Sequence, residues 1–240
     1  MPEYLLALTY AALAGLAIPA GGALASIDTL LPRWLRTEVR HTVIAFGAGV
    51  LIAAIALVLV PEGQASLVTL SETTGILMFV AGGVMFCFAD RAIQRQGGGY
   101  SQLLAMLLDF VPEALALGAM LATAPGTGLL LAILMALQNL PEAFNAYREM
   151  RTSTHLTGSR ILAWFTALAL LGPLSAAAGY WLLQPLPDVL GSIMLFAAGG
   201  ILYLIIQDIA PKVALRRAWA PPLGAVFGFG LGLVGQALTG

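Results

Sequence analysis

Leu137-Gln138-Asn139-Leu140-Pro141-Glu142-Ala143 is a polar, proline-containing segment inside an otherwise apolar part of the chain. It repeats the segment 107–114 (Leu-Leu-Asp-Phe-Val-Pro-Glu-Ala) at an offset of 29 residues, keeping Pro-Glu-Ala and a polar residue four positions before each glutamate. An ionised carboxylate near the centre of a bilayer costs about 2.5–3.5 kcal/mol. Three of them, Asp109, Glu113 and Glu142, therefore indicate a functional site, because a bound cation would offset their charge.

The composition indicates an integral membrane protein. Hydrophobic residues make up 60% of the chain and charged residues 10%, whereas a soluble domain carries roughly 25% charged residues. Apolar stretches of suitable length predict an all-α, polytopic protein with eight transmembrane helices. These spans fill nearly all of residues 1–240, which predicts a single transmembrane domain. They cover about residues 4–25, 42–60, 74–90, 102–122, 128–146, 161–183, 189–210 and 222–239.

The basic residues predict the orientation of these spans. All eleven Lys and Arg residues fall in alternate loops, which the positive-inside rule assigns to the cytoplasm, so both termini are expected outside. The compact chain and the lack of a targeting segment favour a bacterial inner membrane, with the lipid bilayer as a partner. No basic tract suggests nucleic-acid binding. The basic residues are Arg33, Arg36, Arg40, Arg91, Arg95, Arg148, Arg151, Arg160, Lys212, Arg216 and Arg217.

Cysteine and histidine are too scarce for several kinds of site. Cys87 is the only cysteine, so no intrachain disulfide can form. His41 and His155 both lie near span ends, which excludes a zinc site built from Cys and His. The spans contain no His-Glu-x-x-His motif, no Ser-His pair and no evident pair of catalytic aspartates, so we do not expect an enzyme.

A second internal similarity relates spans two and seven. Residues 46–51 (Phe-Gly-Ala-Gly-Val-Leu) match residues 196–201 (Phe-Ala-Ala-Gly-Gly-Ile), and Pro61 matches Pro211, all at an offset of 150. Spans five apart run in opposite directions, as do neighbouring spans four and five. Both pairs therefore predict inverted repeats, which in transporters place the substrate near the membrane midplane. Chance similarity between apolar segments rich in Ala and Gly is the alternative for spans two and seven.

Helical spacing gathers the polar residues of the Pro-Glu repeat. Positions i and i+4 share a helix face, so Asp109 and Glu113 point together, as do Gln138 and Glu142. The short, uncharged loop between spans four and five predicts antiparallel neighbours whose faces meet. The prolines free carbonyl groups that an ion or its waters could satisfy, and cation binding is expected to release protons. The alternative is that protonated carboxylates form hydrogen bonds that only hold the helices together.

These segments resemble the motifs of the ZIP family of divalent-metal transporters, most closely its bacterial GufA-like branch. The family has eight spans, termini outside, and a binuclear metal site between spans four and five whose motifs read approximately His-Asn-x-Pro-Glu-Gly. The resemblance extends to residues 46–50, 83–91 and 203–211. It implies an inverted-repeat bundle of three, two and three helices. It also implies a first metal position formed by Asp109, Glu113, Gln138 and Glu142.

Several residues depart from the family pattern. Asp109 replaces the span-four histidine and Phe110 the following asparagine, while Gly172 stands where the family often has a span-six glutamate. The second metal position then keeps only Asn139 and the shared glutamates. We therefore expect a degenerate site with one metal position.

The resemblance and the carboxylates together predict a secondary transporter that moves a divalent cation of the zinc, manganese or iron class into the cytoplasm. The metal is the substrate, and no cofactor is expected. Oxygen ligands favour harder ions such as Mn²⁺, with Fe²⁺ and Mg²⁺ also gaining relative to Zn²⁺. The alternative is a non-transporting ZIP-like membrane protein that acts as a metal sensor or interaction partner, which Phe110 and Gly172 favour.

Residues outside the repeat have more ordinary interpretations beside functional ones. Asp208 and Gln207 are pathway candidates at the cytoplasmic end of span seven, although Asp208 could equally be an interfacial acid. Glu62 could line the outer entrance or serve as a solvated helix cap. Asp90 is interpreted as an interfacial pair with Arg91. A glycine ridge on span eight, residues 224, 228 and 232, predicts internal packing, with a homodimer seam as the alternative.

Overall fold

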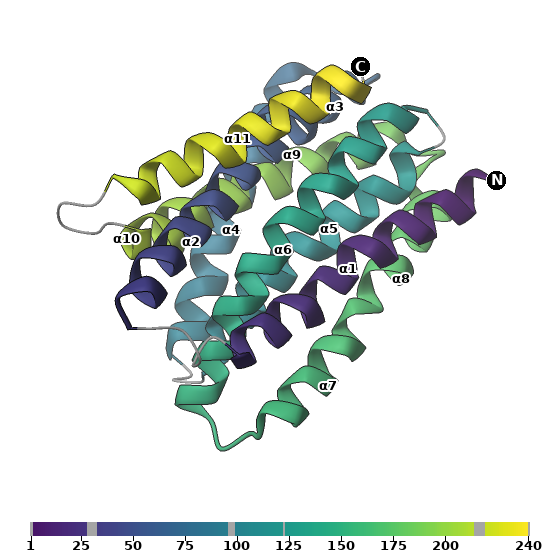
Figure 1. Ribbon diagram of the computed structural model, residues 1–240. Helices are drawn as coiled ribbons and strands as arrows, with labels where there is room; N and C mark the ends of the chain where they lie inside the picture. The colour runs from purple at the N-terminus through teal and green to yellow at the C-terminus, as the bar shows by residue number, and fades with distance from the viewer. Residues whose placement is uncertain (1, 28–32, 96–98, 122, 214–218, 240) are drawn as a thin grey trace.

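The computed structural model describes residues 2–27, 33–95, 99–121, 123–213 and 219–239, without the side chains of residues 33–37, 208, 212 and 213. All regular structure in these ranges is helical (Figure 1). Eight helices in this part of the chain are long and apolar enough to cross a membrane, which confirms the expected number. The chain is thus a multi-pass membrane protein.

Single helices form five of the spans: α1 (Glu3–Ile27), α4 (Glu72–Arg95), α5 (Ser101–Met120), α6 (Pro125–Ser153) and α11 (Ala220–Thr239). The other three spans each contain a π-helical turn. The second comprises α2 (Arg33–Ala54), η2 (Ile55–Leu59) and α3 (Val60–Ala65). The sixth comprises α7 (Gly158–Ala169), α8 (Leu171–Ala178) and η3 (Gly179–Leu183). The seventh comprises α9 (Pro187–Leu204), η4 (Ile205–Ile209) and α10 (Ala210–Val213).

A proline follows each π-helical turn by two residues, at Pro61, Pro185 and Pro211. Proline has no N–H for the carbonyl four residues earlier, so the regular α-helical hydrogen bond is lost there. The residue before the proline instead donates to the carbonyl five residues back, as the Val60 amide does to the Ile55 carbonyl. No π-helical turn precedes the prolines of α5 and α6, and both helices continue through them.

Helices α5 and α6 lie at the centre of the bundle. Helix α5 packs against α6, α8, η3 and α9, while α6 packs against α1, α2 and α5. Helices α4 and α11 are peripheral, and only 17% of the residues in the 18-residue apolar stretch of each are buried. The two termini lie at the same end of the bundle (Figure 1), as an even number of spans requires. At the opposite end α4 and α6 finish with arginines, and we call this the arginine end.

Glycines allow α11 to cross α2 at backbone contact distance. A Cβ built on Gly49 would collide with the Ala225 carbonyl oxygen, and one built on Gly228 would collide with the Phe46 carbonyl oxygen. Gly224 likewise faces a backbone carbonyl of α2. The glycine ridge of span eight therefore packs internally, as expected.

The crossing of α4 and α9 has the same form. A Cβ built on Gly82 would collide with the Phe196 carbonyl oxygen, and one built on Gly199 would collide with the Phe79 carbonyl oxygen. Close approach through small residues replaces the hydrophobic effect as the source of helix association within lipid. The two peripheral helices are therefore held by backbone proximity, because neither buries much apolar side-chain surface.

Asp188, at the start of α9, links that helix to the loop between α3 and α4. Its carboxylate accepts hydrogen bonds from the Thr69 amide at 2.9 Å, the Thr69 hydroxyl at 2.6 Å and the Leu70 amide at 3.2 Å. These bonds lie at the end of the bundle opposite the arginine end.

Candidate functional site

A hydrogen bond between two fully buried side chains joins the polar faces of α5 and α6. Gln138 Nε2 donates to Glu113 Oε2 at 2.6 Å. The two helices are neighbours, as the short loop predicted, so the structure brings these two predicted site residues together.

Asp109 and Glu142 lie one turn closer to the arginine end than the Glu113–Gln138 pair, because α5 and α6 run in opposite directions. Asp109 is 3% exposed and Glu142 is half-buried. Asp109 interacts electrostatically with both glutamates, and the two glutamates interact with each other. The described His, Cys, Asp and Glu side chains nevertheless form no group of three or more arranged to hold a metal ion. The expected convergence of three carboxylates is thus incomplete in this conformation.

The side chains of Asn139 and Phe110 point away from the Glu113–Gln138 pair. The Asn139 Nδ2 donates to the Ala14 carbonyl of α1 at 3.2 Å. The Phe110 ring is fully buried, and a Cβ built on Gly172 would lie 2.9 Å from its Cζ and 2.7 Å from the Ala11 carbonyl oxygen. A glutamate at position 172, which the ZIP resemblance would supply, has no room beside this phenyl ring.

Buried oxygen atoms without a hydrogen-bond donor are concentrated on α5 and α6. All the oxygens of this kind in the described side chains belong to these two helices. A buried acceptor without a partner costs about 1–3 kcal/mol, and carboxylate and amide oxygens are the ligands that hard divalent cations prefer. These atoms are Asp109 Oδ1, Glu113 Oε1, Gln138 Oε1, Asn139 Oδ1, Glu142 Oε2 and Asn145 Oδ1.

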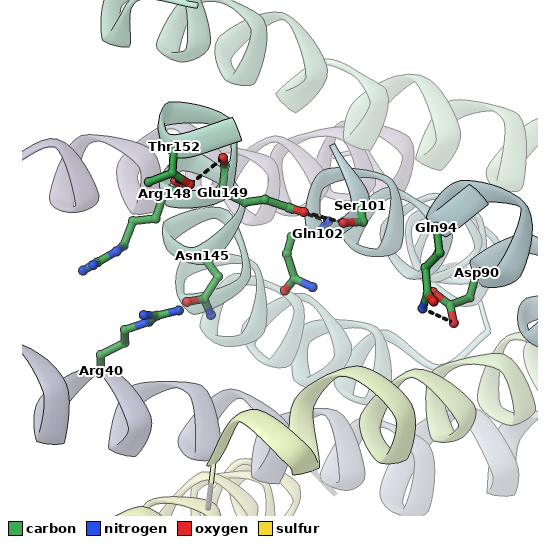
Figure 2. Close-up of a pocket in the computed structure, with 9 residues that line it drawn as sticks. All are labelled: Arg40, Asp90, Gln94, Ser101, Gln102, Asn145, Arg148, Glu149 and Thr152. Carbon is green, nitrogen blue, oxygen red and sulfur yellow. Dashed lines mark hydrogen bonds between the residues drawn. The ribbon is translucent and has the colours of Figure 1, made fainter. Parts of the chain in front are cut away.

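Two cavities lead from this region to the arginine end. A small one of about 20 Å³ contains Glu142 in its wall, together with Ile44 and Gly47 of α2. A larger one of about 430 Å³ lies among the ends of α2, α4, α5 and α6 (Figure 2). Gln102 and Asn145 line both cavities. The small cavity beside Glu142 is therefore adjacent to the larger cavity at the arginine end.

The pathway candidates are only partly described. Gln207 is exposed within η4, and the Asp208 side chain lies outside the described residues. Their neighbour Ile209 lines the small cavity that contains Glu142. Glu62 is half-buried in α3, towards the end of the bundle opposite the arginines. A pathway role for Asp208, Gln207 and Glu62 stays a prediction.

The sequence-based interpretation of Asp90 was wrong. Its carboxylate is 5% exposed and accepts hydrogen bonds from Gln94 Nε2 at 2.9 Å and from the Tyr203 hydroxyl at 3.1 Å, so it joins α4 to α9 rather than pairing with Arg91 at the interface. Tyr203 is distant in sequence, which hid this contact.

Asn145 was missed although a signal was available. It continues the α6 face of Gln138 and Glu142 at positions i+7 and i+3, and that face is a helical stripe of polar side chains.

No protein-family model matches this chain, and no curated protein matches it.

Proposed function

We propose that the protein is a secondary transporter that carries a divalent metal cation into the cytoplasm, with Asp109, Glu113, Gln138 and Glu142 as the metal ligands. The proposal rests on one observation above all, the concentration of donorless buried oxygens on α5 and α6. Such acceptors are costly when left alone, and a cation would satisfy several of them at once. Binding of one cation by all four ligands requires Asp109 and Glu142 to move towards the Glu113–Gln138 pair.

The ligands have a layered arrangement. Glu113 and Gln138 are already joined, so they form a preorganised half of the site. Asp109 and Glu142 supply the second half, and Glu142 also faces the cavities that would lead a cation away. Three carboxylates exceed the charge of a +2 ion, and ligands bind in their deprotonated form, so metal binding releases protons. The absence of imidazole and thiolate ligands from this set favours Mn²⁺ over Zn²⁺.

The architecture that would support transport is a ZIP-like inverted repeat in which α1 to α4 and α7 to α11 form two groups of three spans around α5 and α6. The crossing of α2 with α11 corresponds to that of α9 with α4. Residues 46 and 49 lie 150 positions before residues 196 and 199, and their partners 225 and 228 lie 146 positions after residues 79 and 82. The π-helical turns η2 and η4 are also 150 residues apart. Rocking of the two groups around the central pair would then alternate access to the ligands.

The direction of transport follows from the arginine end. The positive-inside rule assigns that end to the cytoplasm and both termini to the outside. The small cavity beside Glu142 shares Gln102 and Asn145 with the larger cavity at the same end. This conformation is therefore the one from which a cation would leave for the cytoplasm.

Metal flux into proteoliposomes tests the proposal. Purified protein should admit Mn²⁺, and Glu142→Gln and Asp109→Asn should each reduce the rate strongly. Glu72→Gln is the matched control, because it removes an exposed carboxylate at the start of α4, away from the ligands. A protein that moves none of Mn²⁺, Fe²⁺ or Zn²⁺, with the variants indistinguishable from wild type, would refute the proposal.

A metal sensor or partner-binding protein without transport activity is the second candidate. Phe110 favours it, because the ring occupies the space beside Gly172 and restricts the site to one metal position. Metal binding that is retained in detergent, without flux in proteoliposomes, would support this candidate instead.

A further inference from the structure

One face of α6 is polar from the metal ligands to the arginine end. Gln138, Glu142, Asn145 and Glu149 follow one another at intervals of four, three and four residues, which keeps them on the same side of the helix. Asn145 is therefore the next polar side chain on this face of α6 after Glu142, towards the arginine end. Neither the metal site proposed above nor the helix packing accounts for it.

Asn145 stands where the two cavities meet. With Gln102 of α5, it lines both the small cavity that contains Glu142 and the larger cavity at the arginine end. Figure 2 shows Asn145 and Gln102 extending from neighbouring helices into the space between the other lining residues. These two side chains are therefore the ones that border both the cavity beside Glu142 and the larger cavity.

The acceptor atoms of the larger cavity differ in whether they already accept a hydrogen bond. The Glu149 carboxylate accepts hydrogen bonds from the Ser101 hydroxyl and from the backbone N–H of Gln102, the latter at 2.7 Å. It therefore caps the start of α5. Asp90 is held by Gln94 and Tyr203. Asn145 Oδ1, in contrast, is buried and has no donor. It is a buried acceptor in this cavity that a passing cation could use without breaking a hydrogen bond.

We propose that Asn145 is a transit ligand: its carbonyl oxygen takes the cation from Glu142 and passes it to the larger cavity. This inference rests on the transport function proposed above. A neutral amide suits the step, because it replaces part of the hydration shell without adding a charge that would trap the ion. The larger cavity then releases the cation, since its two arginines, Arg40 and Arg148, balance its two carboxylates.

Cysteine accessibility tests the position of Asn145 in the pathway. Cys87 is the only cysteine, so a Cys87→Ser background allows a single new thiol to be followed. Asn145→Cys should react with a charged, membrane-impermeant thiosulfonate added at the arginine end, and Mn²⁺ should slow the reaction. Ala146→Cys is the matched control at the same depth, because Ala146 is fully buried on another face of α6. Equal labelling of the two thiols, or labelling of Asn145→Cys unaffected by Mn²⁺, would overturn the inference.

Flux measurements separate this inference from the function on which it rests. Asn145→Leu should lower Mn²⁺ flux by about tenfold, which corresponds to about 1.4 kcal/mol in the barrier, while equilibrium Mn²⁺ binding in detergent stays at the wild-type value. Asn145→Asp should bind Mn²⁺ more tightly and also transport more slowly. Wild-type flux in Asn145→Leu would refute the transit role but leave the transporter proposal standing. Absence of flux in the wild-type protein would refute both.

Discussion

Replacing Gly82 by alanine is expected to destabilise the protein, whereas the same change at the neighbouring Gly83 is not. A Cβ on Gly82 would overlap the Phe196 carbonyl oxygen, but a Cβ on Gly83 would lie 3.4 Å from the Gly199 carbonyl oxygen, an ordinary contact. Both changes bring the same gain in helix propensity, roughly 1 kcal/mol. The difference between the two variants therefore isolates the cost of separating α4 from α9.

Overpacking of a close contact typically costs about 1–3 kcal/mol. Soluble domains of 150–250 residues lose about 2–4 °C in Tm for each kcal/mol, so a difference of about 2 kcal/mol predicts a gap of about 4–8 °C. Thermal unfolding in one detergent, followed by circular dichroism, measures this gap directly. The crossing of α2 and α11 offers a second pair, Gly228→Ala and Gly230→Ala, because Gly230 has no neighbouring atom within 4 Å of its Cβ position. Equal melting temperatures within each pair would refute the packing argument.

Three further perturbations probe other parts of the structure. Phe110→Ala should lower the free energy of unfolding by about 3–5 kcal/mol because it empties a fully buried site, and Phe110→Leu should cost much less; equal Tm values for the two would contradict this. Mn²⁺ added to weakly buffered protein should release protons, and binding should weaken as the pH falls, because carboxylate ligands must be deprotonated. Glu142→Gln should release fewer protons in the same dye assay, and an unchanged yield would exclude this carboxylate as a ligand. Asp188→Ala should accelerate hydrogen exchange at the Thr69 and Leu70 amides while exchange within α6 stays constant, since only the former lose their acceptor.

Much of the fold could be predicted from the sequence because lipid restricts the conformations that the backbone can adopt. Eight apolar stretches became eight helices, and the short loop after α5 made α5 and α6 neighbours. The bond between Gln138 and Glu113 follows from i, i+4 spacing on two facing helices. These features depend on local periodicity and loop length, which a single sequence contains.

The features that could not be predicted depend on contacts between distant segments. The orientation of Asn139 is set by the Ala14 carbonyl of α1, and the depth of Phe110 is set by Gly172 on another span. The incomplete convergence of the carboxylates depends on the packing between α5 and α6, which spacing within one helix does not determine. The prolines gave some warning of irregular helices, but a π-helical turn precedes Pro61 whereas Pro141 lies within the continuous helix α6.

The π-helical turns determine where a single residue can be deleted from their spans. Each holds one residue more than the α-helical turn it replaces, and an α-helix advances about 100° per residue. Deleting a single residue from Ile205–Ile209 would convert it to a regular turn and leave the helix beyond it, Pro211 included, facing the same way. A deletion in a regular α-helical turn would instead rotate the following residues through that angle. The turns η2 and η4 are therefore places where their spans can lose one residue without changing the side of the helix on which the following residues lie.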